Sequence, residues 1–255
     1  MKSPLRYPGG KSRAVKVITP YFPRISELCS PFLGGGSIEI AQAESGVKVY
    51  SYDIFEPLVC FWDYLLKDNK QLYTEILKLH PMTKEQFYQY QEINPTMPYD
   101  IEKAAMFYAL NRSSFSGSTL SGGMSPDHPR FNMSNLETVL NFSVPNLKVE
   151  KMSCYESILR HPDMFMYLDP PYMLEQQQQN KLYGVQGSTH INFDHASLFE
   201  LLKDRDNWIM SYNNSSFILE MYKDFPIVEP KWAYGMSKDK TAKEALIFSR
   251  NLKPS

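Results

Sequence analysis

The chain has 255 residues, of which 43% are hydrophobic and 22% are charged, and its formal net charge is −1. This composition is typical of a globular protein with one large domain or two smaller ones. The sequence contains no run of 18 apolar residues, which excludes a transmembrane helix of ordinary length. Its three cysteines, Cys29, Cys60 and Cys154, lack CxxC spacing, which argues against a disulfide framework or a zinc cluster.

Strands and helices alternate along both ends of the chain. Ile25–Leu33 and Val47–Tyr52 have strand patterns, and a glycine run between them leads into a helical pattern at Ser37–Ala43. This order is typical of the opening of a parallel α/β sheet. The later part of the chain repeats the alternation, with strands predicted at Val144–Glu150, Met164–Leu168, Trp208–Ser211 and Ala245–Phe248 and helices at Ala196–Leu202 and Ser215–Tyr222.

The middle of the chain has a different pattern. Apolar residues recur at helical spacing from Pro57 to about Tyr90 and again over Ile101–Leu110. The stretch Asn111–Asn135 is rich in Ser, Gly, Asn and Pro, which favours a loop or hairpin. We therefore predict a sheet domain made of residues 1–59 and 146–255, divided by an inserted subdomain at residues 60–145.

Positive charge is concentrated at the two ends of this neutral chain. Residues 1–24 include six basic residues and no acidic one, and residues 231–255 include six basic and two acidic residues. If the two ends meet in the fold, they form one positive face that contacts phosphates. If they do not, they are two separate solvated ends.

A glycine-rich stretch follows the first predicted strand, between Pro31 and Ser37. Glycines at this point let the backbone approach a ligand, and the following helix start offers free N–H groups. Asp53 ends the next strand, 17 residues after Gly36, a spacing that suits a carboxylate accepting hydrogen bonds from ribose hydroxyls. The stretch is neither a complete GxGxxG motif nor a P-loop. A tight turn with Asp53 as a cap is the alternative.

Asp169-Pro170-Pro171-Tyr172 follows the apolar stretch Met164–Leu168 directly. Ligands of open α/β sheets bind beyond the carboxyl ends of the strands, so a reactive group is expected here. The two prolines stiffen the segment and remove N–H donors, which leaves the Asp169 carboxylate and the Pro170 carbonyl as acceptors. Two acceptors beside the aromatic Tyr172 suit an exocyclic amino group on a flat ring.

The N-terminal segment Arg6–Lys11 contains an aromatic residue, two glycines and a lysine. It could fold over a cofactor, with Tyr7 stacking on it and Lys11 placing its charge near a carboxylate. By itself, this segment indicates only a basic loop.

Taken in order, these motifs resemble those of the Dam-type DNA adenine-N6 methyltransferases (D12 class, alpha group). That family has an N-terminal GGK motif, an FxGxGS loop, a target-recognition insert and DPPY, in this order. The GGK motif corresponds here to Tyr7–Lys11, the loop to Phe32–Ser37 and DPPY to Asp169–Tyr172. Further similarity lies in Leu110–Arg112, Asn192–His195 and Ala242–Asn251, so the resemblance runs nearly end to end. It implies an α/β, Rossmann-like S-adenosylmethionine-dependent methyltransferase sheet with an inserted, mostly helical and loop-rich target-recognition subdomain.

The resemblance also implies the reaction. Adenine would be flipped out of double-stranded DNA, and its N6 would take the methyl group directly from S-adenosylmethionine. Asp169 and the Pro170 carbonyl would orient N6, and Tyr172 would stack on the base. The resemblance assigns the cofactor site to the positions that match its motifs, namely Tyr7, Lys11, Phe32, Gly34, Gly36, Asp53 and Asp169. Where the family often has an acidic residue about fifteen positions before DPPY, this chain has Ser153-Cys154-Tyr155, and we expect the Tyr155 backbone to replace that acid.

The predicted insert differs from the form associated with GATC-specific enzymes, so the sequence does not reveal the target site. Arg112 and Arg130 are candidates for contacts to bases or phosphates, and a loop arginine more often contacts phosphate or is simply a surface residue. Lys181 and Tyr183 are candidates for contacts on the DNA side. His190 and His195 are spaced five apart without a third ligand, so we expect no metal site.

Other interpretations remain open from the sequence. The same chemistry could act on RNA adenine, cytosine N4 or a protein glutamine, although the latter two families usually have Ser or Asn in place of Asp169. A catalytically silent DNA-binding relative and a dehydrogenase are further alternatives. The resemblance leaves open a restriction endonuclease as counterpart and a monomer or weak dimer as the oligomeric state. We expect a cytoplasmic protein, in a bacterium or in the host cell of a virus, since the N-terminus lacks a signal-peptide pattern.

Overall fold

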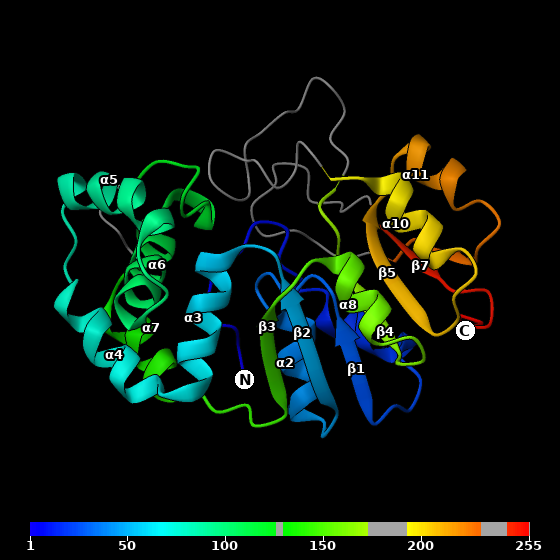
Figure 1. The fold of residues 1–255 in the computed structure, drawn as a ribbon, viewed down its shortest axis with the longest axis horizontal. Helices are drawn as coiled ribbons and strands as arrows, with labels where there is room; N and C mark the ends of the chain where they lie inside the picture. Colours follow the sequence, from blue (N-terminus) through cyan, green and yellow to red (C-terminus); the bar gives the residue numbers. More distant parts are fainter. Residues whose placement is uncertain (126–129, 173–192, 231–243, 255) are drawn as a thin grey trace.

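The computed structural model describes residues 1–125, 130–172, 193–230 and 244–254. Within these residues the centre of the molecule is a seven-stranded sheet with the order β3-β2-β1-β4-β5-β7-β6, which Figure 1 shows between two groups of helices. The strands are β1 (Glu27–Ser30), β2 (Lys48–Asp53), β3 (Leu147–Lys151), β4 (Met166–Leu168), β5 (Trp208–Asn213), β6 (Ile227–Val228) and β7 (Glu244–Phe248).

Strands β1 to β5 are parallel, and β7 runs antiparallel between β5 and β6. The central pair, β1 and β4, is joined at Cys29 and Met166, and the chain order of the strands changes direction there. The predicted α/β sheet is confirmed. The strand β6 and the antiparallel direction of β7 were not predicted, because a two-residue strand has no periodicity and strand direction leaves no local pattern in a sequence.

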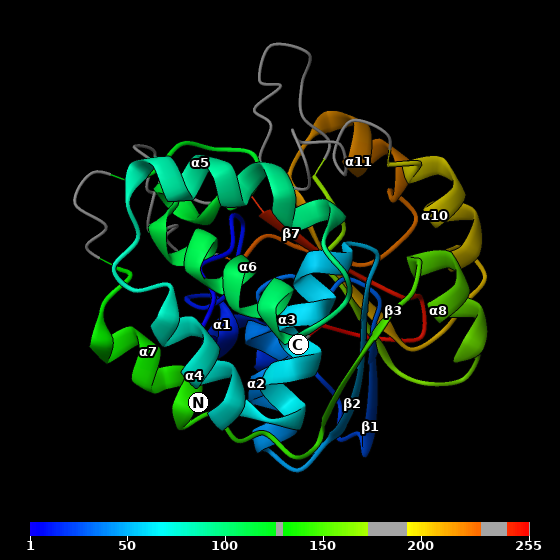
Figure 2. The ribbon, with the colours of Figure 1, turned by 60° about the vertical axis from the view of Figure 1, so that its left-hand side comes forward.

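The described helices include α1 (Val15–Ile18), α2 (Ser37–Glu44), α3 (Glu56–Lys67), α4 (Asn69–Lys78), α5 (Lys84–Ile93), α6 (Ile101–Ser113), α7 (Met133–Leu140), α8 (Cys154–Arg160), α10 (His195–Leu202) and α11 (Ser216–Met221). Figure 2 shows α4 to α7 gathered on one side of the sheet. None of the helices in the described ranges is both long and apolar enough to cross a membrane.

The sheet is buried on both faces because successive strand side chains alternate between two cores. Tyr167 packs with α1 and α2 residues in one core, whereas its neighbours Met166 and Leu168 pack in the other core with residues of α8 and α10. The same alternation places Ile209 in the first core and Met210 in the second. Because β1, β2 and β4 are parallel, their carboxyl ends lie at the same rim of the sheet, and the loops that follow them can form a site there.

An ion pair between a buried lysine and a partly exposed glutamate connects the helical group to the sheet. Lys103 of α6 is fully buried, and its Nζ donates to Glu56 Oε1 of α3 at 2.6 Å and to the carbonyls of Pro95 and Met97. The second oxygen of Glu56 accepts from Lys151 of β3 at 2.6 Å. One carboxylate thus connects α6, which lies within the predicted insert, to β3 of the sheet.

We expect Glu56→Gln to lower the free energy of unfolding by about 3 kcal/mol, because it leaves the Lys103 ammonium buried without its counter-charge. Urea unfolding measures this change. The control is Glu220→Gln, which removes an exposed pair with Lys223 and should change stability by less than about 1 kcal/mol. Equal effects of the two substitutions would contradict the role of Glu56.

Candidate active site

The loop after β1 turns sharply into α2. Gly34 and Gly36 have φ values of +48° and +66°, in the left-handed region where a side chain is strained. The Leu33 N–H donates to the Tyr52 carbonyl at 2.9 Å, which holds the start of the turn against the end of β2. The predicted glycine turn between strand and helix is therefore present.

Asp53, the last residue of β2, fixes this loop. Its Oδ2 accepts from the Gly34 N–H at 3.1 Å, and its Oδ1 accepts from the Phe55 N–H at 2.9 Å. Burial raises the pKa of Asp53, and these hydrogen bonds only partly oppose the rise. The cap-like arrangement predicted as an alternative is thus present, but each carboxylate oxygen can still accept a further hydrogen bond.

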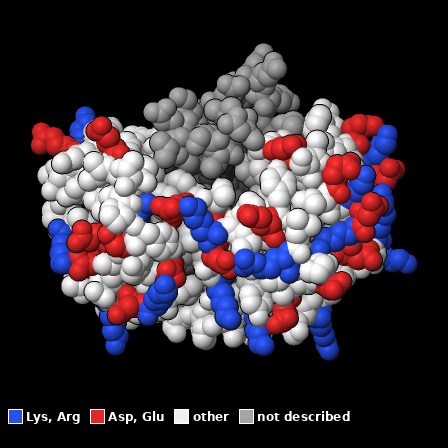
Figure 3. Space-filling model, viewed as in Figure 1, with Lys and Arg blue, Asp and Glu red and all other residues white. Residues whose placement is uncertain are grey.

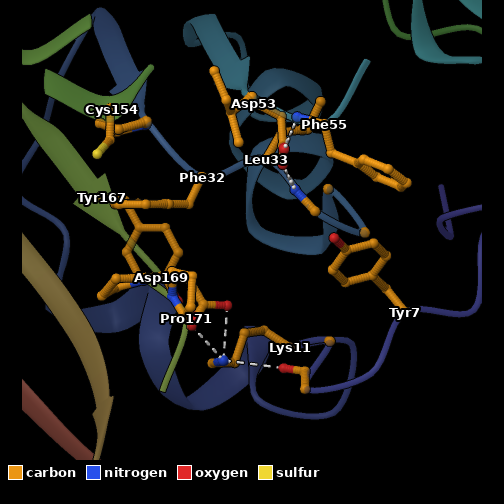
Figure 4. Close-up of a pocket in the computed structure, with 18 of the residues that line it drawn as sticks. Tyr7, Lys11, Phe32, Leu33, Asp53, Phe55, Cys154, Tyr167, Asp169 and Pro171 are labelled. Atoms are coloured by element: carbon orange, nitrogen blue, oxygen red, sulfur yellow. Dashed lines mark hydrogen bonds and ion pairs between the residues drawn. The ribbon is translucent and has the colours of Figure 1, made fainter. Parts of the chain in front are cut away.

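Two aromatic rings enclose the glycine loop. A Cβ at Gly34 would lie 3.0 Å from Cε1 of Tyr7, and a Cβ at Gly36 would lie 3.0 Å from Cζ2 of Trp62. Trp62 of α3 also donates its Nε1–H to the Gly34 carbonyl at 3.1 Å. The N-terminal segment therefore lies directly on the loop, as Figure 4 shows for Tyr7.

Lys11 and Asp169 form the central ion pair of the site. The Lys11 Nζ donates to Asp169 Oδ1 at 2.7 Å, to Asp169 Oδ2 at 2.8 Å and to the Gly9 carbonyl at 3.0 Å (Figure 4). Burial alone would lower the pKa of Lys11, but the charges of Asp169 and Glu244 outweigh burial and raise it. Lys11 is therefore a permanent cation that orients the Asp169 carboxylate.

The aromatic residue of the tetrapeptide is held from two sides. Tyr172 donates its hydroxyl to Oε1 of Glu244 at 2.5 Å, and its ring stacks on Tyr212 with a centroid distance of 5.9 Å. The Lys11 Nζ lies 5.0 Å from the centroid of the Tyr172 ring. The ring position is thus determined by residues from three separate parts of the chain.

A second buried acid, Glu39 of α2, lies on the floor of the site. It is 2% exposed and accepts from the Ser30 hydroxyl at 2.6 Å. Burial raises the pKa of Glu39 to about 7. The charges of Asp169 and Lys11 both act on it, so Glu39 belongs to the same electrostatic cluster.

Most of these residues line one cavity of about 310 Å³ at the carboxyl ends of β1, β2 and β4, whereas Trp62, Tyr212 and Glu244 contact lining residues from outside it. Phe193 and Asp194, which precede α10, close its edge, and the Tyr155 hydroxyl donates to the Asp194 carbonyl at 3.1 Å. The structure brings all the predicted catalytic and cofactor residues to this cavity: Tyr7, Lys11, Phe32, Gly34, Gly36, Asp53, Tyr155, Asp169, Pro170, Pro171 and Tyr172.

The residues predicted to contact DNA are not part of this lining. Arg112 is 7% exposed, and its guanidinium donates to the carbonyls of Arg130 and Pro4 at 3.0 and 3.3 Å. Arg130 itself is exposed. Lys181, Tyr183 and His190 lie outside the described residues. The described part of the chain holds no group of three or more potential metal ligands.

Three residues of the site were not predicted individually: Glu39, Trp62 and Glu244. Glu39 is a single acid in the otherwise apolar start of α2, and Glu244 is a single acid at the start of an apolar strand. An isolated carboxylate within a buried element is the signal that could have identified both. Trp62 had no such signal, because a tryptophan in a helix most often belongs to the core.

We expect Gly34→Ala to destabilise the protein by about 1–2 kcal/mol more than Gly46→Ala does, measured by urea unfolding. Both positions have positive φ, but a Cβ at Gly46 has nothing within 4 Å, whereas one at Gly34 meets the Tyr7 ring. The comparison therefore separates backbone strain from the contact with Tyr7. Equal losses would show that Tyr7 does not constrain the loop.

The sequence matches the family of D12 class N6 adenine-specific DNA methyltransferases over residues 7–236. A search of curated proteins gave no match. The matched region covers most of the chain and includes the N-terminal segment, the glycine loop and the Asp169–Tyr172 tetrapeptide. The chain therefore belongs to the D12 class of N6 adenine-specific DNA methyltransferases, enzymes that methylate adenine N6 in DNA.

Proposed function

We propose that this enzyme uses S-adenosylmethionine to methylate N6 of an adenine that has been flipped out of duplex DNA. The observation that carries the proposal is the position of the Asp169–Tyr172 segment. It stands at the end of β4 beside the glycine loop, in the same cavity, and Lys11 holds its carboxylate. Binding and reaction sites for two different molecules are thus adjacent.

The cavity fits S-adenosylmethionine by its size and chemistry. A volume of about 310 Å³ is at the lower end of small-molecule sites. Phe32 and Ile54 supply apolar walls, and Asp53 offers acceptor positions to ribose hydroxyls. When bound, this cofactor supplies a methyl group on a positively charged sulfur. The negative carboxylates of Asp169 and Glu39 in this cavity favour the binding of such a positive charge.

The tetrapeptide supplies what the acceptor amino group requires. The Asp169 carboxylate and the Pro170 carbonyl accept the two N–H bonds of N6, which keeps electron density on the nitrogen. Lys11 fixes both oxygens of Asp169, so the carboxylate is oriented before the substrate arrives. Tyr172 offers its ring face to the base. Catalysis then comes from alignment and preorganised charge and needs no covalent enzyme intermediate.

The position of this acceptor site supports base flipping. Asp169 is only 23% exposed in its side chain, and it lies within the cavity. An adenine that remains stacked and paired in a duplex cannot bring N6 to such a group, so the base must leave the helix. The energy of unpairing, a few kcal/mol, has to be recovered from contacts in the site and along the backbone.

We propose that residues 60–145 form the subdomain that recognises the target sequence and that residues 1–59 and 146–255 form the catalytic domain. The N-terminal segment contacts this insert, because the Arg6 N–H donates to Asn111 Oδ1 at 2.9 Å and Asn111 Nδ2 donates back to the Arg6 carbonyl at 2.7 Å. The subdomain that we propose recognises the target is therefore joined by hydrogen bonds to the segment that carries Lys11.

The DNA-facing surface is expected near this junction. Burial and the charges of Arg130 and Arg112 lower the pKa of Arg6, so three guanidinium groups gather here. Over the face that Figure 3 shows, basic and acidic side chains are interspersed rather than gathered in one stripe. A local concentration of positive charge favours phosphate binding.

We expect Asp169→Ala to reduce methyl transfer to adenine by about a thousandfold or more, because N6 loses its charged acceptor and Lys11 loses its partner. Labelled S-adenosylmethionine and unmethylated duplex DNA, followed by nucleoside analysis, measure the reaction. Asp204→Ala, at an exposed aspartate, is the control and should retain normal activity. A folded Asp169→Ala variant with normal activity would refute the mechanism.

We expect Arg130→Ala to weaken DNA binding about equally across sequences and to reduce the salt dependence by about one phosphate contact, since exposed loop arginines mostly contact phosphate. Binding titrations at several salt concentrations measure both effects. Arg112→Ala should instead lower stability, because its guanidinium ties Pro4 to Arg130. A change in sequence preference with Arg130→Ala would assign this residue to base recognition.

A further inference from the structure

Glu244 is a buried acid that the proposed mechanism does not use. It is the first residue of β7 and is 2% exposed. Its Oε1 accepts the Tyr172 hydroxyl at 2.5 Å, whereas its Oε2 is buried without a hydrogen-bond partner among the described residues. Burying a carboxylate with one oxygen unsatisfied costs free energy. Such a cost directly behind two residues that line the cavity, Tyr172 and Lys11, points to a functional constraint.

Glu244 also faces the cation of the site. Lys11 Nζ lies 3.8 Å from Glu244 Oε1 and 2.7 Å from Asp169 Oδ1. The lysine therefore sits between two carboxylates, one in the segment after β4 and one at the start of β7. Because Lys11 also lies 5.0 Å from the centroid of the Tyr172 ring, Glu244 contacts both neighbours of Asp169 that shape the acceptor site.

We propose that Glu244 is a positioning residue for methyl transfer, whose ionised carboxylate holds the Tyr172 ring and the Lys11 ammonium in the geometry that the acceptor base requires. The inference rests on the proposed roles of Asp169 and Tyr172. Glu244 acts through Tyr172 and Lys11 and has no contact with the reacting atoms. Its strand, β7, is antiparallel to β5, which carries Tyr212, whose ring stacks on that of Tyr172.

The proposal makes the activity sensitive to pH. The groups that face Glu244 are Lys11 from the N-terminal segment, and Asp169 and Tyr172 from the segment after β4. Glu39 of α2 faces Lys11 and Asp169 in turn. Burial, with the charge of Asp169, raises the pKa of Glu244 to about 7 although Lys11 opposes the rise. Activity should therefore fall as the pH decreases through about 7, where Glu244 becomes protonated.

The first test removes the charge but retains the shape. In the full-length enzyme, Glu244→Gln should lower the single-turnover rate of methyl transfer about tenfold and change the affinity for S-adenosylmethionine less than twofold. The rate of this variant should also fall less below pH 7 than the wild-type rate does. Glu220→Gln, at an exposed glutamate of α11 that pairs with Lys223, is the matched control.

The second test examines the contact between Glu244 and Tyr172. Glu244→Met and Tyr172→Phe, singly and together, form a double-mutant cycle in which both partners of one hydrogen bond are removed. If Glu244 acts through this bond, the double variant should be little slower than the slower single variant. Additive losses would overturn that coupling. Glu244→Gln with the wild-type rate and pH profile would overturn the proposal as a whole.

Separate controls distinguish a failure of the variants to fold from a failure of the proposed function. Thermal unfolding and cofactor binding of each variant show whether the site is intact. If Glu244 variants do not fold, Tyr172→Phe still tests the bond, and an unchanged rate in that variant refutes the proposal. If wild-type protein itself fails to methylate adenine in duplex DNA, the proposed function is wrong. If the wild-type protein methylates adenine and the Glu244 variants do so at the same rate, the inference about Glu244 is wrong, whereas the proposed function stands.

Discussion

The buried ion pair between Lys11 and Asp169 is the interaction on which the site depends. It joins a residue near the N-terminus to a residue at the end of β4, and the lysine is only 4% exposed. A charge pair in such surroundings is stable only when both partners are well bonded. Lys11 meets this condition with both Asp169 oxygens, the Gly9 carbonyl and the nearby Glu244. The N-terminal segment is therefore an integral part of the rim of the cavity.

The same segment makes the glycine loop rigid. Tyr7 covers Gly34 and Gly35 from one side, and Trp62 meets Gly36 from α3. Since Glu56 in that helix also connects Lys103 of α6 to Lys151 of β3, the position of the loop depends on how the helical group packs against the sheet. A cavity built in this way is preorganised, because its backbone donors and its carboxylates are already oriented by contacts outside the site.

Charge in the site is balanced by few groups. Among the residues that the structure describes, Asp169, Glu39 and Glu244 are arranged around the ammonium of Lys11, and burial raises the pKa of both glutamates to about 7. Such a cluster responds to a bound positive charge and to pH within the physiological range. Arg112 illustrates the opposite use of charge. Its guanidinium donates to two backbone carbonyls, so an arginine in a predicted recognition insert can have a structural role there.

The sequence by itself determined the α/β class, most of the strands, and the residues of the three motifs, because strand periodicity, glycine turns and Asp-Pro-Pro-Tyr are local patterns within a few positions. Only the tertiary structure decided which of these residues meet. The pairing of Lys11 with Asp169 spans 158 positions, and the bond between Tyr172 and Glu244 spans 72. Contacts at such separations depend on strand order and on the direction of β7. A single sequence does not record either, since both follow from packing of the whole chain.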